Sequence, residues 1–568
     1  MSQELSGIAA SPGVAIAEAV VLEDEVSYEE YKVSDTEGEK QRLAQAIKES
    51  KEQLKKIKTK VKEEMGDKKA QIFEAHLLAV EDPELIKKAE TKIEEEELNA
   101  EAALDQAVES FAQMLDAMDN EYMKERAGDL RDVGSRILKN LLGLNTLSLA
   151  ELEREVIVVA HDLAPSDTAQ IDKELVQAFA TEIGSRTSHT AIMARSLEIP
   201  AVVGTNSILA EVKTGDEIIV DGLDGAVIVN PSQSELKEYE EKAQDYAAHK
   251  KRLESLKEEA AETRDGHQVE LAANIGTPND LEGALGNGAE GIGLYRSEFL
   301  YMDRDSLPGE EEQFKAYQEV ANKIDGSVVI RTMDIGGDKE LPYLDMPDEM
   351  NPFLGYRAIR MSLDRPEIFK EQLRAILRAS AYGEIKIMYP MISSLEQLRE
   401  ANKILAEVKT ELKSEEIEFD EDLEVGIMIE VPAAAMIADI LAKEVDFFSI
   451  GTNDLIQYTT ATDRMNEKIA NFYQPFHPAV LRLIKRVIDA AHGEGKWVGM
   501  CGEMAGDERL TPFLLGAGLD EFSMSAVSIL EVKEQIRNLS LEEAEKIAEE
   551  ALSYETAQEV RNYLTNYN

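Results

Sequence analysis

The spacing of hydrophobic residues changes several times along the chain and divides it into regions of different structure. Apolar residues alternate in short runs over 7–21, around a Ser-Pro-Gly turn, which predicts two strands. Over 36–142 strand signals vanish, glycine and proline are scarce, and apolar residues recur at helical spacing in four stripes. This pattern predicts a bundle of antiparallel helices. Strand-like runs return over 155–229, so we expect one α/β module that the bundle interrupts and residues 1–21 complete.

The second half of the chain has a different and more regular pattern. The segment 233–262 is rich in lysine and glutamate and carries one narrow apolar stripe, which predicts a long, mostly solvated linker helix. Beyond it, short apolar runs alternate with helical stretches. The runs cover 269–273, 291–294, 328–332, 385–389, 425–429, 447–450, 497–501 and 521–524. Eight such units predict a (β/α)8 barrel, with a doubly wound open sheet as the alternative.

These patterns describe a multidomain α/β protein, as expected for 568 residues, which are too many for one hydrophobic core. The predicted α/β module comprises residues 1–21 and 146–232, and the helical bundle inserted into it comprises residues 22–145. The linker helix takes residues 233–262, and the barrel takes residues 263–568.

The amino-acid composition limits which binding partners and which cellular compartment we expect for this protein. With 113 acidic and 61 basic residues the net charge is -52, which disfavours nucleic acid and anionic lipid as ligands and fits a basic partner or simple solubility. The single cysteine allows no internal disulfide and is typical of a reducing cytoplasm. The start of the chain has no signal-peptide pattern, and no apolar run is long enough to span a membrane.

If the barrel is correct, its active site lies where the strands end, and the residues at those positions are informative. Arg296 and Arg464 follow two different strands and Arg331 lies near the end of a third, and arginine forks bind phosphate or carboxylate. Glu430 and Asp454 follow neighbouring strands and suit Mg²⁺, which takes one or two carboxylates together with substrate oxygens. We therefore expect a small phosphorylated acid and a metal at this mouth. The alternative is that each arginine only pairs with a local acid on the surface.

Two further residues are candidates for chemistry. Cys501 ends the seventh strand, where a lone buried cysteine is either a packing residue or, because of its place at the mouth, an acid or base. His189 directly precedes a helix predicted over 191–197. The N-terminus of a helix binds phosphoryl groups and disfavours imidazolium, which leaves a neutral, nucleophilic histidine. The alternative for His189 is a plain capping role.

Taken together, these motifs resemble enzyme I of the bacterial phosphoenolpyruvate-dependent sugar phosphotransferase system, along essentially the whole chain. The segments that carry the resemblance are 184–189, 298–301, 334–339, 351–357, 451–454 and 499–503. The resemblance implies a swivelling phosphohistidine domain with an inserted helical bundle, a linker helix and a C-terminal barrel. It also implies transfer of the phosphoryl group of phosphoenolpyruvate to the enzyme and then to the carrier protein HPr, with release of pyruvate.

The resemblance implies a role for each matching residue. His189 is the residue phosphorylated, on Nε2, and Cys501 protonates the enolpyruvate carbon. Glu430 and Asp454 are the implied ligands of Mg²⁺. Phosphoenolpyruvate is held, by the same resemblance, by Arg296, Arg331, Arg357, Asn453, Asp454 and Arg464. HPr docks on the helical insertion near 72–85 and 114–126, and the family works as a cytoplasmic homodimer joined through the barrels.

The chain departs from the family pattern at two positions. Ser185 stands where the family has a second glycine, and it would be strained if its backbone needed a positive φ. Ala164 stands where threonine is commoner.

Two other functions compete with this one. A pyruvate phosphate dikinase or phosphoenolpyruvate synthase shares the phosphohistidine module and the barrel, but it needs an ATP-binding module, and no glycine-rich phosphate loop precedes His189. A regulatory relative without turnover would lack His189, Cys501 or the metal acids, and all are present.

Overall fold

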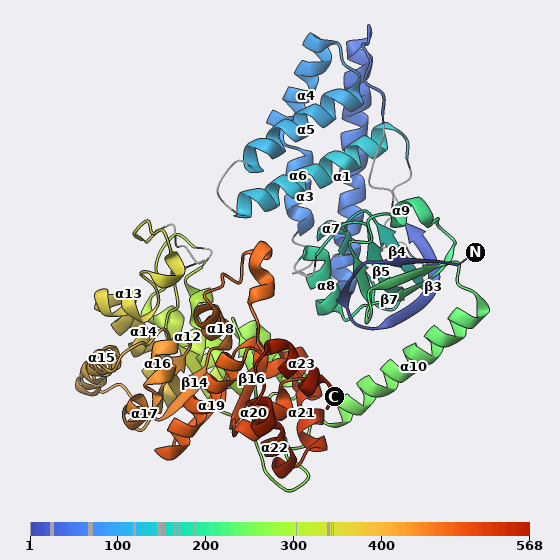
Figure 1. Cartoon of the computed structure of the whole chain (residues 1–568). Coiled ribbons are helices and arrows are strands. Elements are labelled where there is room, and N and C mark those ends of the chain that lie inside the picture. The colour runs from blue at the N-terminus through green and yellow to red at the C-terminus, as the bar shows by residue number, and fades with distance from the viewer. Residues whose placement is uncertain are drawn as a thin grey trace. The chain divides into compact units, whose positions relative to one another are not determined.

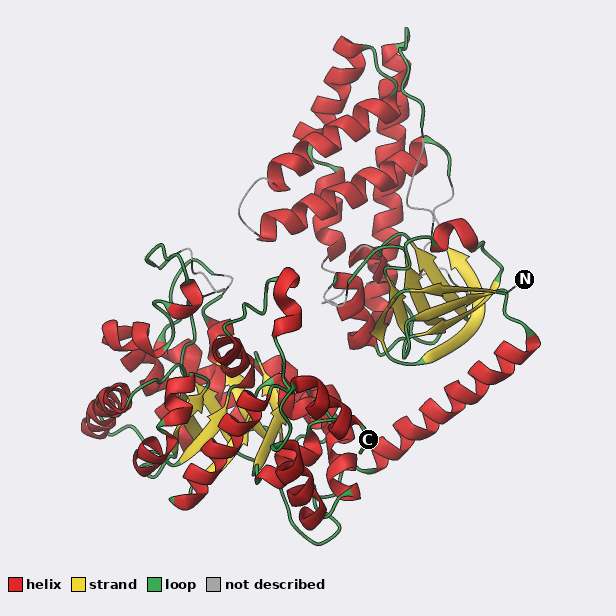
Figure 2. Ribbon diagram, in the orientation of Figure 1, coloured by secondary structure: helices red, strands yellow, loops and turns green. Residues whose placement is uncertain are grey.

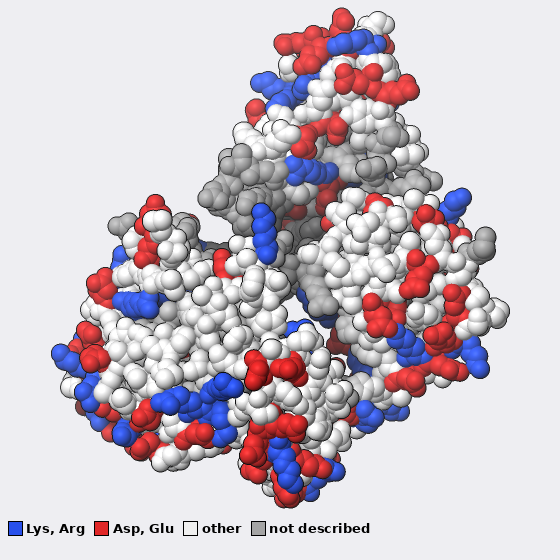
Figure 3. Space-filling model, in the orientation of Figure 1, with Lys and Arg blue, Asp and Glu red and all other residues white. Residues whose placement is uncertain are grey.

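A computed structural model describes most of the chain, and it separates into two compact units, Met1–His249 and Lys250–Asn568. The described residues are 2–22, 28–65, 72–116, 121–144, 149, 152, 154–163, 165–168, 170–185, 188–302, 304–337, 341, 343–344 and 346–567. In the view of Figure 3, acidic side chains are scattered over both units, with basic side chains among them and white areas between. No helix in the described ranges is long and apolar enough to cross a membrane.

The first unit is built on one mixed sheet, in the strand order β1-β8-β7-β3-β4-β5-β6-β2 (Figures 1 and 2). Its strands are β1 (Gln3–Ser6), β2 (Ile8–Ser11), β3 (Val14–Val21), β4 (Val156–Ala160), β5 (Val176–Thr181), β6 (Ala201–Val203), β7 (Glu217–Asp221) and β8 (Ala226–Val229). The short helices α7 (Pro165–Thr168), α8 (His189–Leu197) and α9 (Ile208–Glu211) connect them. Every residue of β4 is buried, which explains its unbroken apolar sequence. The N-terminal strands therefore do complete an α/β module, as predicted.

The helical bundle lies in the chain between β3 and β4, and its described residues contain one helix more than the four predicted stripes. Its described helices are α1 (Thr36–Met65), α3 (Ile72–Val80), α4 (Pro83–Glu96), α5 (Ala100–Asp116) and α6 (Glu121–Leu141). The additional helix is α4, which begins at Pro83 after a cap in which the Asp82 carboxylate accepts bonds from the backbone N–H groups of Glu84 and Leu85 at 2.8 and 3.1 Å. The Asp-Pro pair that ends one helix thus also starts the next.

The predicted linker helix is shorter than expected: α10 spans Gln233–Ser255, and the prediction of helix to residue 262 was wrong. After Ser255 the chain is held by backbone carbonyls that accept bonds from a neighbouring helix of the barrel unit. Lys533 Nζ donates to the carbonyls of Lys257 and Glu259 at 3.3 and 2.8 Å, and Arg537 donates to that of Ala260 at 2.7 Å. These side chains bind carbonyls beyond the last turn of the helix, so tertiary contacts hold the chain in a non-helical path after Ser255.

The second unit is a closed barrel of eight parallel strands surrounded by helices (Figure 2). Its strands are β9 (Glu270–Ile275), β10 (Gly291–Arg296), β11 (Val328–Arg331), β12 (Ile385–Tyr389), β13 (Val425–Ile429), β14 (Phe447–Ile450), β15 (Trp497–Met500) and β16 (Glu521–Met524). Because β16 pairs with β9, the sheet has no edge, and the open-sheet alternative is excluded.

Helices cover the outside of this barrel (Figure 1). They are α11 (Leu281–Gly286), α12 (Glu310–Ala321), α13 (Ile359–Asp364), α14 (Pro366–Ala379), α15 (Leu395–Ser414), α16 (Pro432–Met436), α17 (Ala438–Leu441), α18 (Thr452–Thr460), α19 (Pro478–Gly493), α20 (Thr511–Ala517), α21 (Ile529–Asn538), α22 (Leu541–Ala551) and α23 (Ala557–Thr565). Alternate strand residues pack outward against these helices, in one large apolar core. The others point inward, where Leu294, Val329, Met388, Met428 and Phe447 form a small separate cluster. Because side chains fill the barrel interior, a substrate-binding site is expected at the ends of the strands.

Candidate functional site

At the carboxyl ends of the strands, buried arginines and acids from distant segments form one network. Arg331, the last residue of β11, pairs with Glu298, and its Nη1 lies 3.0 Å from Oδ2 of Asp334. Arg357 binds the same Asp334 carboxylate through Nε and Nη2, at 3.2 and 3.1 Å. The Nη2 atom of Arg357 also lies 3.1 Å from Oδ2 of Asp454. Asp334 therefore holds two guanidinium groups side by side, and the arginines pair with buried acids and not with surface ones.

Burial and the neighbouring charges have opposite effects on the pKa values of Arg331 and Arg357. Burial by itself would lower the pKa of Arg331 and of Arg357, but the neighbouring carboxylates raise both pKa values above their usual range. Arg296, at the end of β10, differs: burial and the nearby positive charge of Arg331 lower its pKa. The Arg296 cation is thus poorly compensated, which makes this part of the mouth attractive to an anion.

The two predicted metal-binding acids lie in the same network. Glu430 is 1% exposed, and its Oε1 accepts a 2.6 Å bond from the backbone N–H of Met391. Burial raises the pKa of Glu430 to about 8, helped by the charges of Asp454 and Asp334. Among the described residues, the buried Oδ1 atom of Asp454 has no hydrogen-bond partner. A divalent cation fits this donor set, because it would relieve the repulsion and occupy the unpaired oxygen. The described residues contain no cluster of three or more His, Cys, Asp or Glu that could hold a metal without a substrate's help.

Asn453 and Arg464 lie at the rim of the mouth. The Asn453 amide donates to Oε1 of Glu503 at 3.3 Å and accepts a 3.1 Å bond from the Glu503 backbone. This pair joins the start of α18 to the loop after β15. Arg464 Nη1 lies 4.0 Å from Oδ1 of Asp454 and is partly exposed.

Cys501 directly follows β15 and is 4% exposed, in the small apolar cluster of the barrel interior. Burial raises the pKa of its thiol to about 11, so the thiol keeps its proton at neutral pH. Its backbone carbonyl accepts a 3.0 Å bond from the side chain of Asn274. Cys501 is thus both a packed residue and a thiol at the strand ends, so its packing does not exclude acid chemistry.

The mouth also contains residues to which the sequence analysis assigned no role. Glu298 and Asp334 are fully or almost fully buried and hold the arginines, and Asn274 contacts the Cys501 segment. Asn274, Asp334 and Glu298 follow a predicted strand within about four residues, and this position is the signal by which they could have been found. Strand-end position alone did not tell which of them pairs with which arginine.

The second predicted site lies in the other unit, at the N-terminus of α8. His189 is the first residue of this helix, and Ser188 Oγ caps it by accepting a 3.3 Å bond from the N–H of Ala191. Thr190 Oγ1 donates to Asp162 Oδ1 at 2.7 Å, which ties the helix start to the loop after β4. The His189 side chain, residues 186–187 and Ala164 lie outside the described residues.

The predicted strain at Ser185 does not occur. Among the described residues with positive φ, Gly184 has a φ of 132°, whereas Ser185 is absent from that group. A Cβ at Gly184 would lie 2.9 Å from Cβ of Val203. The position that requires glycine is therefore Gly184, which the chain has kept.

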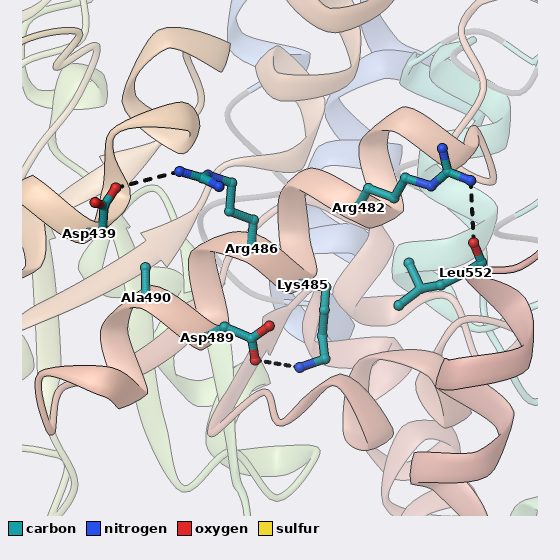
Figure 4. Close-up of a pocket in the computed structure, with 7 residues that line it drawn as sticks. All are labelled: Asp439, Arg482, Lys485, Arg486, Asp489, Ala490 and Leu552. Atoms are coloured by element: carbon teal, nitrogen blue, oxygen red, sulfur yellow. Dashed lines mark hydrogen bonds and ion pairs between the residues drawn. The ribbon is translucent and has the colours of Figure 1, made fainter.

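A surface hollow of about 570 Å³ lies away from this mouth, along α19 (Figure 4). Its lining residues are Asp439, Arg482, Lys485, Arg486, Asp489, Ala490 and Leu552. The basic side chains are engaged locally: Lys485 pairs with Asp489, Arg486 lies 3.5 Å from Asp439, and Arg482 donates to the Leu552 carbonyl at 3.4 Å. None of the predicted site residues lines it.

Comparison with protein families assigns the class that this architecture defines. Residues 6–126 match the N-terminal segment of the PEP-utilising enzymes, residues 152–225 match their mobile domain, and residues 250–541 match their PEP-binding domain. The chain is therefore a PEP-utilising enzyme, with the arginine network inside the PEP-binding segment.

Full-length relatives identify the particular family. The chain is 54% identical over 569 residues to the phosphoenolpyruvate-protein phosphotransferase of Staphylococcus carnosus, covering 100% of this chain and 99% of the relative. It is 55% identical to that of Priestia megaterium over 99% of both chains, and 55% identical to that of Listeria innocua over 100% of both. The chain belongs to the phosphoenolpyruvate-protein phosphotransferase family, as its motifs predicted.

Proposed function

We propose that this enzyme transfers the phosphoryl group of phosphoenolpyruvate to its own His189, and from there to a histidine of the carrier protein HPr, with release of pyruvate. The observation that carries this proposal is the buried network of arginines and acids at the barrel mouth, within the PEP-binding segment. A dikinase or synthase would need an ATP-binding module, and the relatives that match over the full chain are named for transfer to protein.

In this proposal, arginine forks hold the phosphate and carboxylate of the substrate. Arg331 and Arg357 are buried and Arg296 is half-buried, on three different segments, and Asp334 already orients the first two. Such prior orientation lowers the entropy that substrate binding must overcome. Asn453 and Arg464 complete the set from the rim of the mouth. The incompletely compensated charge of Arg296 favours the entry of an anion.

The acids Glu430 and Asp454 would hold Mg²⁺. The support is the unpaired, buried Oδ1 of Asp454 and the mutual repulsion that raises the pKa of Glu430. When bound there, Mg²⁺ supplies positive charge that stabilises the transferring phosphoryl group. Asp454 also contacts Arg357, so it couples the metal-binding acids to the arginine network.

The chemical step divides between His189 and Cys501. The lone pair of His189 Nε2 forms the new bond to phosphorus while the phosphorus–oxygen bond to the enol breaks, and its electron pair stays on that oxygen. The carbon–carbon double bond then takes the Cys501 proton at the methylene carbon, which yields pyruvate and a thiolate. The thiol regains its proton from water. A thiol that is protonated at neutral pH suits this donor role.

The proposed protein partner, oligomeric state and cellular location follow from the family resemblance. HPr would dock on the helical insertion, where Leu78 and Met114 are 76% and 51% exposed and lie within the two predicted surfaces. We further propose a homodimer joined through the barrels and a cytoplasmic location, for which the single cysteine is the support. The domain limits predicted from sequence, 1–21 with 146–232, 22–145, 233–262 and 263–568, are kept as proposed limits.

The test is incubation with phosphoenolpyruvate labelled in the phosphoryl group and Mg²⁺, followed by mapping of the label. We expect acid-labile label on His189 and release of pyruvate, and transfer of the label when HPr is added. His189→Ala is expected to accept no label while it still binds phosphoenolpyruvate, because that site lies in the other unit. Label on His189→Ala, or on another residue of the native enzyme, would overturn the proposal.

A further inference from the structure

A buried carboxylic acid, Glu521, and a half-buried one, Glu270, lie side by side at the amino-terminal end of the barrel strands and thus opposite the mouth. Glu521 is the first residue of β16, Glu270 is the first residue of β9, and the two are register partners on neighbouring strands. Glu521 is 2% exposed. Within the described part of the chain, neither of its carboxylate oxygens has a hydrogen-bond partner.

Two glycines make room for this carboxyl group. A Cβ placed on Gly293 of β10 would lie 2.3 Å from Oε1 of Glu521, and one placed on Gly499 of β15 would lie 2.8 Å from the same atom. Both distances are too short for any side chain. The glycines therefore form a built position for the carboxyl group inside the barrel, and not a surface on which it happens to rest.

The charges around Glu521 favour its neutral form. Burial raises the pKa of Glu521 to about 8, and the nearby acids Glu270 and Asp520 add to that effect while Lys386 of β12 opposes it. The pKa of Glu270 is also raised by its burial. Lys386 does not neutralise the pair by itself, because it forms ion pairs with Glu424 at 3.0 Å and Glu384 at 3.3 Å.

The same interior connects Glu521 to the thiol at the mouth. Gly499, the register partner of Glu521, lies two residues before Cys501, a distance of about 7 Å along a strand. Ser523 Oγ, two residues beyond Glu521, donates to Oδ1 of Asn274 at 2.7 Å, and Asn274 in turn donates to the Cys501 carbonyl at 3.0 Å. Because Cys501 and the apolar side chains that cluster with it are almost fully buried, water screens a charge on Glu521 only weakly at the sulfur.

We propose that Glu521 is a positioning residue for the Cys501 proton: its uncharged carboxyl allows the thiol to give up that proton, and its ionised carboxylate opposes the step. This inference rests on the proposed role of Cys501 as proton donor. When the sulfur–hydrogen bond breaks, the electron pair stays on sulfur, and a second negative charge in the same closed interior raises the energy of the resulting thiolate. Arg331 favours that thiolate from the mouth, and Glu430 disfavours it.

The single cysteine of the chain allows a direct test without substrate. The rate of alkylation by iodoacetamide and the ultraviolet absorbance of the thiolate are followed in the whole enzyme from neutral to alkaline pH. The native enzyme is expected to show two ionisations, because the thiolate becomes harder to form once Glu521 has lost its proton. Glu521→Gln is expected to lose the part of the lower inflection that Glu521 causes, while Glu430 still contributes the rest. It should react about tenfold faster in the alkaline range, which corresponds to a thiol pKa lower by about one.

Two matched variants serve as controls. Glu384→Gln removes the same charge at the same end of the barrel from an exposed side chain, and its profile should equal that of the native enzyme. Glu521→Asp keeps the acid and should keep the two inflections. Identical profiles for Glu521→Gln and the native enzyme would overturn the proposal. If Glu521→Gln fails to fold, a single ionisation in the native profile would overturn it equally.

The failure of this inference is distinguishable from failure of the proposed function. The thiol profile is measured without phosphoenolpyruvate, so it reports only on Glu521 and Cys501. If Cys501→Ala keeps native pyruvate formation, the donor role fails whatever the thiol profile shows. The full proposal predicts in addition that pyruvate formation by the native enzyme falls above the lower inflection, and that Glu521→Gln reduces this fall.

Discussion

Single residues at the barrel mouth have properties that come from their buried neighbours. Asp334 holds Arg331 and Arg357, so the guanidinium groups are fixed before any substrate arrives. Cys501 has the opposite environment, since it lies among apolar side chains that keep its thiol protonated. The site therefore combines guanidinium groups that are already oriented with a thiol that is still protonated, which suits the binding of an anion and the delivery of one proton.

Replacing Cys501 by alanine tests the proton donor. We expect pyruvate formation to slow by about 10²–10⁴-fold, the usual value of a positioned proton donor, while phosphoenolpyruvate binding is retained. Pyruvate release and a separate binding titration measure the two effects. Alkylation of native Cys501 should reproduce the loss, and Cys501→Ala should then be insensitive to the reagent. Native turnover in Cys501→Ala would leave the residue with a packing role only.

The turn before His189 offers a second test at this scale. Because Gly184 has a φ of 132° and little space for a Cβ, Gly184→Ala is expected to lower the free energy of unfolding by about 1–3 kcal/mol. Ser185→Gly relieves no backbone strain, so we expect phosphorylation of His189 to stay within about twofold of the native rate. Urea unfolding and label incorporation measure these effects. A severalfold faster Ser185→Gly enzyme would show that the serine does limit phosphorylation.

At the scale of elements, tertiary contact and local capping decide where helices end. The cap at Asp82 starts α4 directly after α3, and the carbonyl contacts after Ser255 hold the chain in a non-helical path beyond α10. Lys533 is the main residue that holds the chain after the end of α10. Its side chain is buried, and its Nζ also lies 3.4 Å from Oε1 of Glu290. It holds the chain that enters the barrel in a defined position.

Lys533→Ala is therefore expected to destabilise the barrel unit by about 1–3 kcal/mol, the usual cost of leaving buried polar groups without their partner. Arg537→Ala, which removes a more exposed donor to the Ala260 carbonyl, should cost clearly less. The midpoint of urea unfolding, followed in the whole enzyme, compares the two. Equal losses would mean that burial of the donor does not matter at this junction.

The whole molecule consists of two units with different tasks in the proposed reaction. His189 lies in Met1–His249, the arginine network lies in Lys250–Asn568, and the boundary falls within α10. Direct phosphoryl transfer requires the donor and acceptor atoms to be close and aligned. One histidine that serves both phosphoenolpyruvate and HPr must therefore meet them in turn, which requires the units to move relative to each other.

Cutting the chain after Ser255 tests this division of work and leaves the contacts of Lys533 inside the barrel fragment. The first fragment is expected to fold, to bind HPr and to exchange phosphate with phospho-HPr, but to accept none from phosphoenolpyruvate. The second fragment should bind phosphoenolpyruvate with Mg²⁺ and complete no turnover. Calorimetry and label transfer measure these outcomes. Phosphorylation of the first fragment by phosphoenolpyruvate alone would place the donor site beside His189.

The sequence by itself determined the strands of the barrel and the candidate positions that follow them. The runs at Ile385–Tyr389 and Val425–Ile429 are strands with the predicted bounds, because parallel strands that are buried over most of their length need mostly apolar sequence. Since parallel strands of a barrel all end at one mouth, the same pattern predicted that Arg331 and Glu430 would lie near one another.

Only the tertiary structure decided how these residues are paired and which groups are buried. Asp334 binds Arg357, 23 positions away, and Arg357 contacts Asp454 a further 97 positions along the chain. Glu521 looks in the sequence like one more glutamate of an acidic protein, yet the closing of β16 onto β9 buries it in the barrel interior. The spacing of hydrophobic residues indicates which side of a helix or strand is buried. Which residue pairs with a given charged side chain depends on segments that come together only when the barrel closes.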